Sequence, residues 1–220
     1  RRPPRSTLSS WSAASDVYKR QGAGTWWTAT ERVAIVAATR RSLPLPLGEA
    51  APDIAGLSDA VGSDDLSPLT HEVVRCLVVD AGRITRDWAT AAVDRMGPGR
   101  YVEVVALVVQ TLPIDLLCDL LGRPRQDLPV PKRGEPSRLV PDGLGQEGAF
   151  VPWAVDGWLG PNVARALSFV PEDNSRRMAV VMSMYSGEHF EEMVWRHRAL
   201  SRPQVELVAA RTSAVNECFY

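Results

Sequence analysis

Apolar side chains recur at helical spacing along most of the chain, and no segment alternates apolar and polar residues for long enough to predict a strand. In residues 26–41, for example, Val33, Val36 and Ala37 fall on one face of a helix. Further helices are expected at residues 70–79, 86–96, 101–121, 161–169, 172–185, 189–199 and 203–215. The pattern predicts an all-α fold.

Proline and glycine mark where these helices are interrupted. Residues 49–67 contain proline, glycine and aspartate, and the longer stretch 123–150 is rich in proline and glycine; neither shows a period, so we expect the first to be a loop and the second a linker or a surface loop. The tripeptide 97–99, Gly-Pro-Gly, predicts a turn. Pro113 is expected to kink or split the apolar helix 101–121, because proline cannot donate the helical hydrogen bond and clashes with the preceding turn.

The N-terminal segment does not resemble folded protein. Residues 12–21 read SAASDVYKRQ, and the last six match the translation of GAT GTG TAT AAG AGA CAG, the end of a transposase adaptor used in sequencing libraries. A secretory signal would need an apolar stretch after its arginines, and none follows. A mitochondrial-type presequence is the alternative. We expect residues 1–21 to be uncoupled from the fold.

Charge and cysteine content exclude several classes of protein. The formal net charge is −1, but residues 1–21 carry +4, so the remainder carries −5 and is not expected to bind nucleic acid. The most apolar stretch, residues 102–121, is interrupted by four polar side chains, so no membrane span is expected. Three cysteines are too few for a secreted disulfide framework. We therefore expect a soluble, cytoplasmic protein.

The C-terminal sequence RPQVELVAARTSAVNECFY places Glu206 twelve residues before Cys218. It resembles the carboxymuconolactone decarboxylase and alkylhydroperoxidase D-like family, whose motif is a glutamate, Cys-x-x-Cys twelve residues later, and a histidine four residues beyond the second cysteine. Phe219 and Tyr220 would fill the x-x positions, so the motif is expected to continue beyond the chain as given. The resemblance is strong from about Leu200 onward and looser over residues 70–122.

The resemblance implies the alkylhydroperoxidase D-like helical fold and a thiol-dependent, peroxiredoxin-type peroxidase. Cys218 would be one of the redox pair and Glu206 a proton-relay carboxylate. The implied partners are a hydroperoxide substrate, a dithiol reductant and further copies of the chain in a homo-oligomer, with no cofactor and no metal. Without the second cysteine and the histidine we expect no turnover, and we expect activity when the native downstream sequence is added.

Such a site is physically coherent. Two cysteines three residues apart in the first turn of a helix lie side by side, and the helix N-terminus favours the reactive thiolate. A nearby glutamate can move the proton that the hydroperoxide receives. Twelve residues of straight helix span about 18 Å, so the chain must turn between Glu206 and Cys218. Asn216 is well placed for that turn.

Two other functions stay open. One is a non-redox enzyme on the same fold, a carboxymuconolactone decarboxylase or related lactone enzyme that uses acid–base residues. The other is a catalytically inert helical interaction module. Cys218 followed by two spacer residues favours the redox function, because a decarboxylase would not need a thiol pair.

A short internal similarity predicts two related halves. The segment Thr-Glu-Arg-Val-Ala at Glu31 is similar to Val-Glu-Leu-Val-Ala at Glu206, 175 residues later. We expect a degenerate half at residues 22–122 and a truncated second half at residues 151–220. In the first half, the positions that match the two cysteines and the histidine are Leu43, Pro46 and Ala50.

The remaining reactive residue types have structural interpretations. Cys76 and Cys118 lie on apolar helix faces and are expected in the core. His71 is expected to be solvated near a helix start. His189 and His197 are eight residues apart, with Glu192 between them, a spacing that does not favour a metal site. The tryptophans expected to anchor the core or an interface are Trp26, Trp27, Trp153 and Trp158.

Overall fold

The computed structural model describes residues 22–46, 48, 51–184 and 199–215, and within them the protein is mostly helical. Its elements are α2 (Ala29–Ser42), α3 (Pro68–Val79), the 3₁₀ turn η1 (Ala81–Arg83), α4 (Arg86–Met96), α5 (Pro98–Leu120), β1 (Leu144–Gly145), β2 (Trp153–Ala154), α6 (Asn162–Arg165), α7 (Pro171–Met184) and α8 (Arg202–Val215). The all-α prediction is confirmed, whereas the alkylhydroperoxidase D-like fold stays a prediction. The expected leader at 1–21 and nearly all of the helix expected at 189–199 lie outside the described residues.

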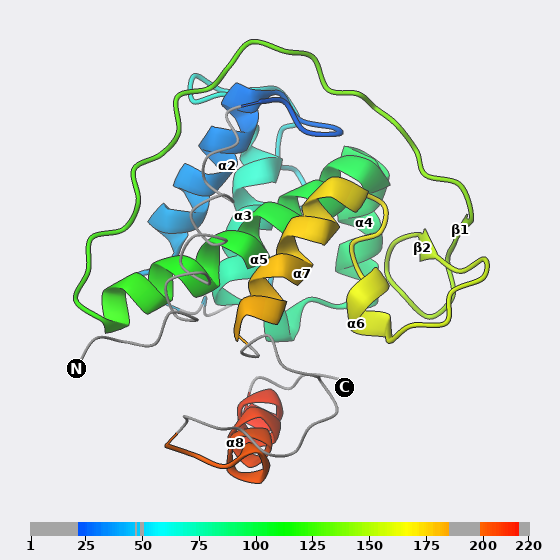
Figure 1. Cartoon of the computed structure of the whole chain (residues 1–220). Coiled ribbons are helices and arrows are strands. Elements are labelled where there is room, and N and C mark those ends of the chain that lie inside the picture. The colour runs from blue at the N-terminus through cyan, green and yellow to red at the C-terminus, as the bar shows by residue number, and fades with distance from the viewer. Residues whose placement is uncertain (1–21, 47, 49–50, 185–198, 216–220) are drawn as a thin grey trace.

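Helix α5 forms the centre of the bundle, and α2, α3, α4 and α7 pack against it (Figure 1). Its Val102, Val104, Ala106 and Val108 are at most 1 % exposed. A helix that is apolar around most of its circumference is stable only when other elements cover it, which explains the central position. By length and composition α5 could also cross a membrane, but 67 % of its most apolar window is buried inside the bundle. A buried core helix meets the same criterion.

Side-chain caps fix where three of the surrounding helices begin. Thr28 and Glu31 form a capping box at the start of α2, in which each side chain accepts a hydrogen bond from the other residue's backbone N–H. Ser67 caps α3, and Thr85 caps α4. Because these oxygens satisfy otherwise unpaired N–H groups, each cap stabilises its helix by about 1 kcal/mol. The predicted bounds of α4 agree with the structure.

The long helix differs from its prediction at both prolines. Only Gly97 forms the turn expected at 97–99: it has φ of 82°, a conformation that glycine adopts without strain, and α5 begins at Pro98. Proline is favoured at the first helical position because the N–H it lacks would be unpaired there. Pro113 lies inside α5 and does not split it, since burial of the surrounding apolar residues outweighs one lost hydrogen bond.

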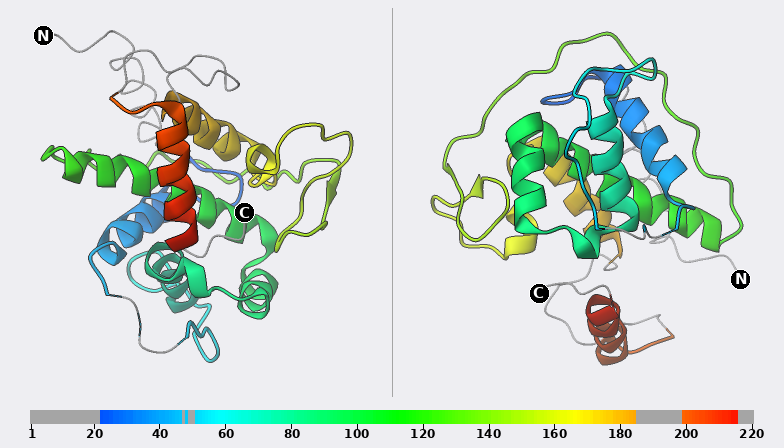
Figure 2. Two further views of the ribbon diagram at one scale, coloured as in Figure 1. Left: turned by 90° about the horizontal axis from the view of Figure 1, so that it is seen from below. Right: turned by 180° about the vertical axis from the view of Figure 1, so that it is seen from behind.

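The connector after α5 runs around the outside of the bundle without helix, as expected for residues 123–150 (Figure 1). Its end contributes β1, which pairs with β2 in a minimal antiparallel ladder, Leu144 opposite Ala154 and Gly145 opposite Trp153. These two-residue strands were not predicted, because alternation over two residues leaves no pattern. The ladder closes a loop beside α4 and α6 (Figures 1 and 2).

Helix α8 is set apart from the bundle (Figures 1 and 2). Arg202 is its one buried residue among those described, whereas Leu207, Val208 and Val215 are 71 %, 57 % and 63 % exposed. Helix α2, which holds the matching glutamate Glu31, packs instead against α3 and α5. The division into two related halves therefore stays a prediction.

Candidate functional site

Local hydrogen bonds position the helix that carries the predicted glutamate. Ser201 precedes α8, and both its backbone N–H and its hydroxyl donate to the side-chain oxygen of Gln204, at 2.8 and 3.0 Å. Pro203 lies in the first turn, where its missing N–H costs nothing. The sequence Ser-Arg-Pro-Gln thus encodes a helix start, and Glu206 follows one turn later.

Glu206 presents its carboxylate on the surface of α8. Its side chain is 47 % exposed, and Oε1 accepts a hydrogen bond from Nε of Arg202 at 3.1 Å. Arg202 lies one helical turn before it and is itself 8 % exposed. An ion pair this exposed contributes at most about 1 kcal/mol to stability, so the pair orients the carboxylate more than it stabilises the fold. The carboxylate stays accessible to solvent and solutes.

The predicted redox residue, Cys218, lies outside the described residues, as does Asn216. The structure therefore gives no distance between Glu206 and Cys218. The turn expected between them also stays a prediction.

Cys76 is a core cysteine, as predicted, with its thiol held in an unreactive state. It is fully buried in α3, and its Sγ donates to Oε1 of Glu72 at 3.3 Å, while Nη2 of Arg75 lies 3.4 Å from the sulfur. Burial, and then the hydrogen bond to Glu72, raise the pKa of the Cys76 thiol to about 12. At pH 7 only about one thiol in 10⁵ would be the nucleophilic thiolate.

Cys118 is also buried, 3 % exposed near the end of α5. Neither described cysteine forms a disulfide. Both side chains fill space in the core, as free cysteines commonly do. Peroxide in solution would reach neither sulfur without local opening of the bundle.

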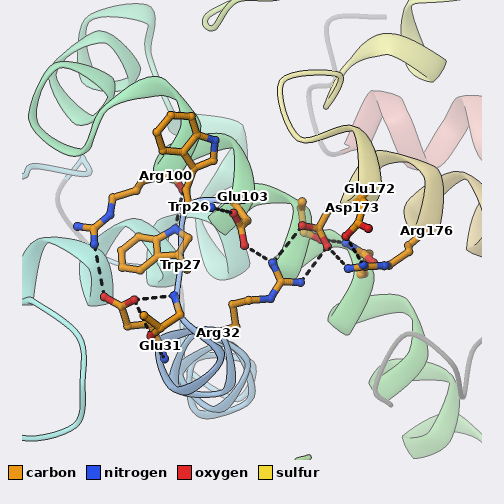
Figure 3. Close-up of polar contacts among 12 residues, drawn as sticks. Trp26, Trp27, Glu31, Arg32, Arg100, Glu103, Glu172, Asp173 and Arg176 are labelled. Atoms are coloured by element: carbon orange, nitrogen blue, oxygen red, sulfur yellow. Dashed lines mark hydrogen bonds and ion pairs between the residues drawn. The ribbon is translucent and has the colours of Figure 1, made fainter. Parts of the chain in front are cut away.

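The strongest concentration of buried charge is a network that sequence reasoning missed (Figure 3). Arg32 of α2 contacts the carboxylates of Glu103 on α5 and Asp173 on α7, the latter through bonds of 2.9 and 3.0 Å. Arg176 donates to Asp173 at 2.8 Å, and the backbone N–H of Trp26 donates to Glu103 at 2.6 Å. The network therefore joins three helices of the bundle and the segment before α2.

Burial and charge act in opposite directions on the two acids of this network. Burial raises the pKa of Glu103, and the charge of Arg32 only partly offsets it. Burial also acts to raise the pKa of Asp173, but hydrogen bonds and charges from Arg32 and Arg176 outweigh it, so that pKa is lowered. Two arginines face two carboxylates in a closed space. Such a cluster can hold helices in register, but solutes do not reach it.

The remaining sequence predictions are partly confirmed. Trp27 and Trp153 are buried, at 3 % and 7 % exposure. The guanidinium of Arg100 lies over the Trp27 ring at 4.3 Å (Figure 3). His71 lies in the first turn of α3, with its side chain 34 % exposed and its Nε2 2.8 Å from Asp64. Trp27 and Trp153 are therefore core residues, Trp26 is partly buried against the core, and Trp158 is partly exposed outside it.

Among the described residues no three His, Cys, Asp or Glu side chains are grouped so that they could hold a metal ion. His189, Glu192 and His197 lie outside those residues. No protein-family model, curated protein or solved structure matches the chain.

Proposed function

We propose that this chain is a thiol-dependent peroxidase in which Cys218 attacks the hydroperoxide and Glu206 relays the proton. The thiolate sulfur takes the terminal oxygen, the O–O bond breaks, and the alkoxide leaves as an alcohol after receiving a proton. Cys218 becomes a sulfenic acid, which the second cysteine of the motif would convert to a disulfide with release of water, and a dithiol reductant would then restore both thiols.

The burial of the other two cysteines carries this proposal. The chain has three cysteines, and both Cys76 and Cys118 are inaccessible, the first with its pKa raised to about 12. Only a thiolate attacks peroxide at a useful rate. Cys218 is therefore the remaining candidate for a reactive thiol at neutral pH, and it is also the residue that lies twelve positions after Glu206, as in the family motif.

The surroundings of Glu206 support its assigned role. A proton-relay carboxylate must exchange protons with both substrate and solvent. Glu206 is half exposed on α8, whereas Glu103, Asp115 and Asp173 are buried at 0 %, 1 % and 1 % exposure and are each paired with arginine. Glu206 meets the requirement of access, and those three acids do not.

A single-turnover assay tests the proposal. The reduced chain is mixed with a small excess of cumene hydroperoxide, and the loss of peroxide is followed with a ferrous indicator. We expect about one equivalent consumed per chain, none by Cys218→Ser, and a rate roughly 10²-fold lower for Glu206→Gln, the scale of losing a positioned acid–base group. Glu147→Gln, which alters an exposed glutamate in the connector, is the matched control and should leave the rate unchanged.

The competing functions give other results in the same experiment. A decarboxylase-type enzyme would consume no peroxide but would convert a muconolactone in a reaction that depends on Glu206. An inert interaction module would do neither. Equal consumption by Cys218→Ser and the unmodified chain would contradict the proposal.

A further inference from the structure

A pocket of about 360 Å³ lies where the end of the connector meets the bundle. One side is formed by α3, η1 and α5, through residues such as Leu77 and Val105. The other is formed by residues 149–153 and the segment after α6, including Phe150 and Leu167.

The pocket is lined without charge. Apart from Tyr101 and Trp153, every side chain that lines it is an aliphatic group or the phenyl ring of Phe150. Two cations hold its wall without lining it: Arg86 lies 4.9 Å from the Phe150 ring, and Arg165 lies 4.0 Å from the Trp153 ring. These cation–π contacts fix the wall and leave the interior neutral.

Trp153 supplies a polar group that the fold itself does not use. Its Nε1 is buried and has no hydrogen-bond partner among the described residues, and its side chain lines the pocket, as does that of Tyr101, which is 5 % exposed. Burial raises the pKa of Tyr101 to about 12, so the hydroxyl is a neutral donor at pH 7. Buried polar groups are nearly always paired in native proteins. The unpaired indole N–H of Trp153, on a residue that lines the pocket, therefore indicates a missing partner there.

We propose that this pocket binds an uncharged, largely apolar small molecule whose oxygen accepts a hydrogen bond from the Trp153 indole N–H. An apolar cavity of about 150 Å³ holds one benzene ring, so a pocket of about 360 Å³ suits two fused rings. The rings of Tyr101, Phe150 and Trp153 favour an aromatic ligand. An anionic ligand would lose its hydration without gaining a counter-charge.

Calorimetric titration at pH 7 tests the site with 2-naphthol, which is neutral at that pH, and with the matched anion 2-naphthoate. We expect one saturable site for 2-naphthol per chain and at least tenfold weaker binding of 2-naphthoate. Trp153→Phe, which removes the indole N–H, should weaken 2-naphthol about threefold to tenfold, as for one net hydrogen bond. Equal binding of the two ligands, or no saturable binding of 2-naphthol, would overturn the proposal.

A blocking variant separates this site from general adsorption. Ala81 lines the pocket but is exposed, so Ala81→Trp can fill the opening without disturbing the core. It should weaken 2-naphthol at least tenfold, with an unchanged helical circular dichroism spectrum. Ala91→Trp, on an exposed position of α4 that lines a different pocket, should bind like the unmodified chain. The proposal fails if Ala81→Trp binds as tightly as Ala91→Trp. It does not depend on the peroxidase proposal, because neither variant alters Glu206 or Cys218.

Discussion

Removal of the Arg32 guanidinium is the sharpest test of what holds the bundle together. Arg32→Met keeps the volume of the side chain but leaves Glu103, which is 0 % exposed, without its cation. Asp173 still has Arg176. Breaking a buried ion pair by removing one partner costs about 3 to 5 kcal/mol, since the other charge stays buried and uncompensated. In a chain of this size that corresponds to roughly 6 to 20 °C in Tm.

The same helix provides the matched control. Arg41 pairs with Asp64 at 3.5 Å, and the two side chains are 58 % and 51 % exposed. A pair of this kind contributes at most about 1 kcal/mol, so Arg41→Met should be nearly neutral. Equilibrium unfolding in urea, followed by circular dichroism at 222 nm, measures the free energy of unfolding of each variant.

A double variant identifies the cause of the loss. In Arg32→Met with Glu103→Gln the uncompensated carboxylate is absent, so the double variant should be more stable than Arg32→Met alone, by roughly 1 to 3 kcal/mol. Two results would refute the reasoning: Arg32→Met costing no more than Arg41→Met, or the double variant being less stable than the single one.

Three further predictions concern pH, the buried thiol and association. The pKa of Glu103 is raised in the folded state, so its contribution to stability is present in full below the unfolded value of about 4.5 and is lost as pH rises through the folded value. In urea titrations, the free energy of unfolding of Glu103→Gln should therefore increase relative to that of the unmodified chain as pH rises above 4.5. A relative decrease over the same pH range would contradict this prediction. Cys76→Ala should lose about 1 kcal/mol of unfolding free energy and consume peroxide at the same rate as the unmodified chain. Loss of peroxide consumption in this variant would show that Cys76 is essential. Leu116 and Leu120 are 43 % and 83 % exposed on one face of α5, which the homo-oligomer expected from the family resemblance could bury. Sedimentation velocity should then show assemblies larger than the 24.1 kDa chain, and Leu116→Glu with Leu120→Glu should dissociate them. A chain that sediments as a monomer would contradict this expectation.

Sequence pattern predicted the elements whose signals are local. The bounds of α4 follow from the Thr85 cap and the glycine after Met96, both of which act within one turn. The start of α5 was predicted at residue 101, three residues late. Pro98 suits a turn and a first helical position equally well, and burial of the helix decides between them.

Sequence pattern did not predict the buried charges. Glu103 and Asp115 were visible as interruptions of an apolar run, which is the signal that could have marked them. Their partners Arg32 and Arg40 lie 71 and 75 residues away, so the pairs exist only because α2 packs on α5. Likewise, the spacing of twelve residues to Cys218 does not give the distance from Glu206, because that distance depends on a turn after α8.

Mapping the site of oxidation tests the central claim most directly. The reduced chain is treated with one equivalent of cumene hydroperoxide in the presence of dimedone, which traps sulfenic acids, and is then digested with trypsin. The three cysteines fall in different tryptic peptides, with Cys218 in residues 212–220. We expect the dimedone adduct on that peptide, formed far more slowly in Glu206→Gln, and no adduct on the peptides of Cys76 and Cys118. An adduct on Cys76 with Cys218 unmodified would contradict it.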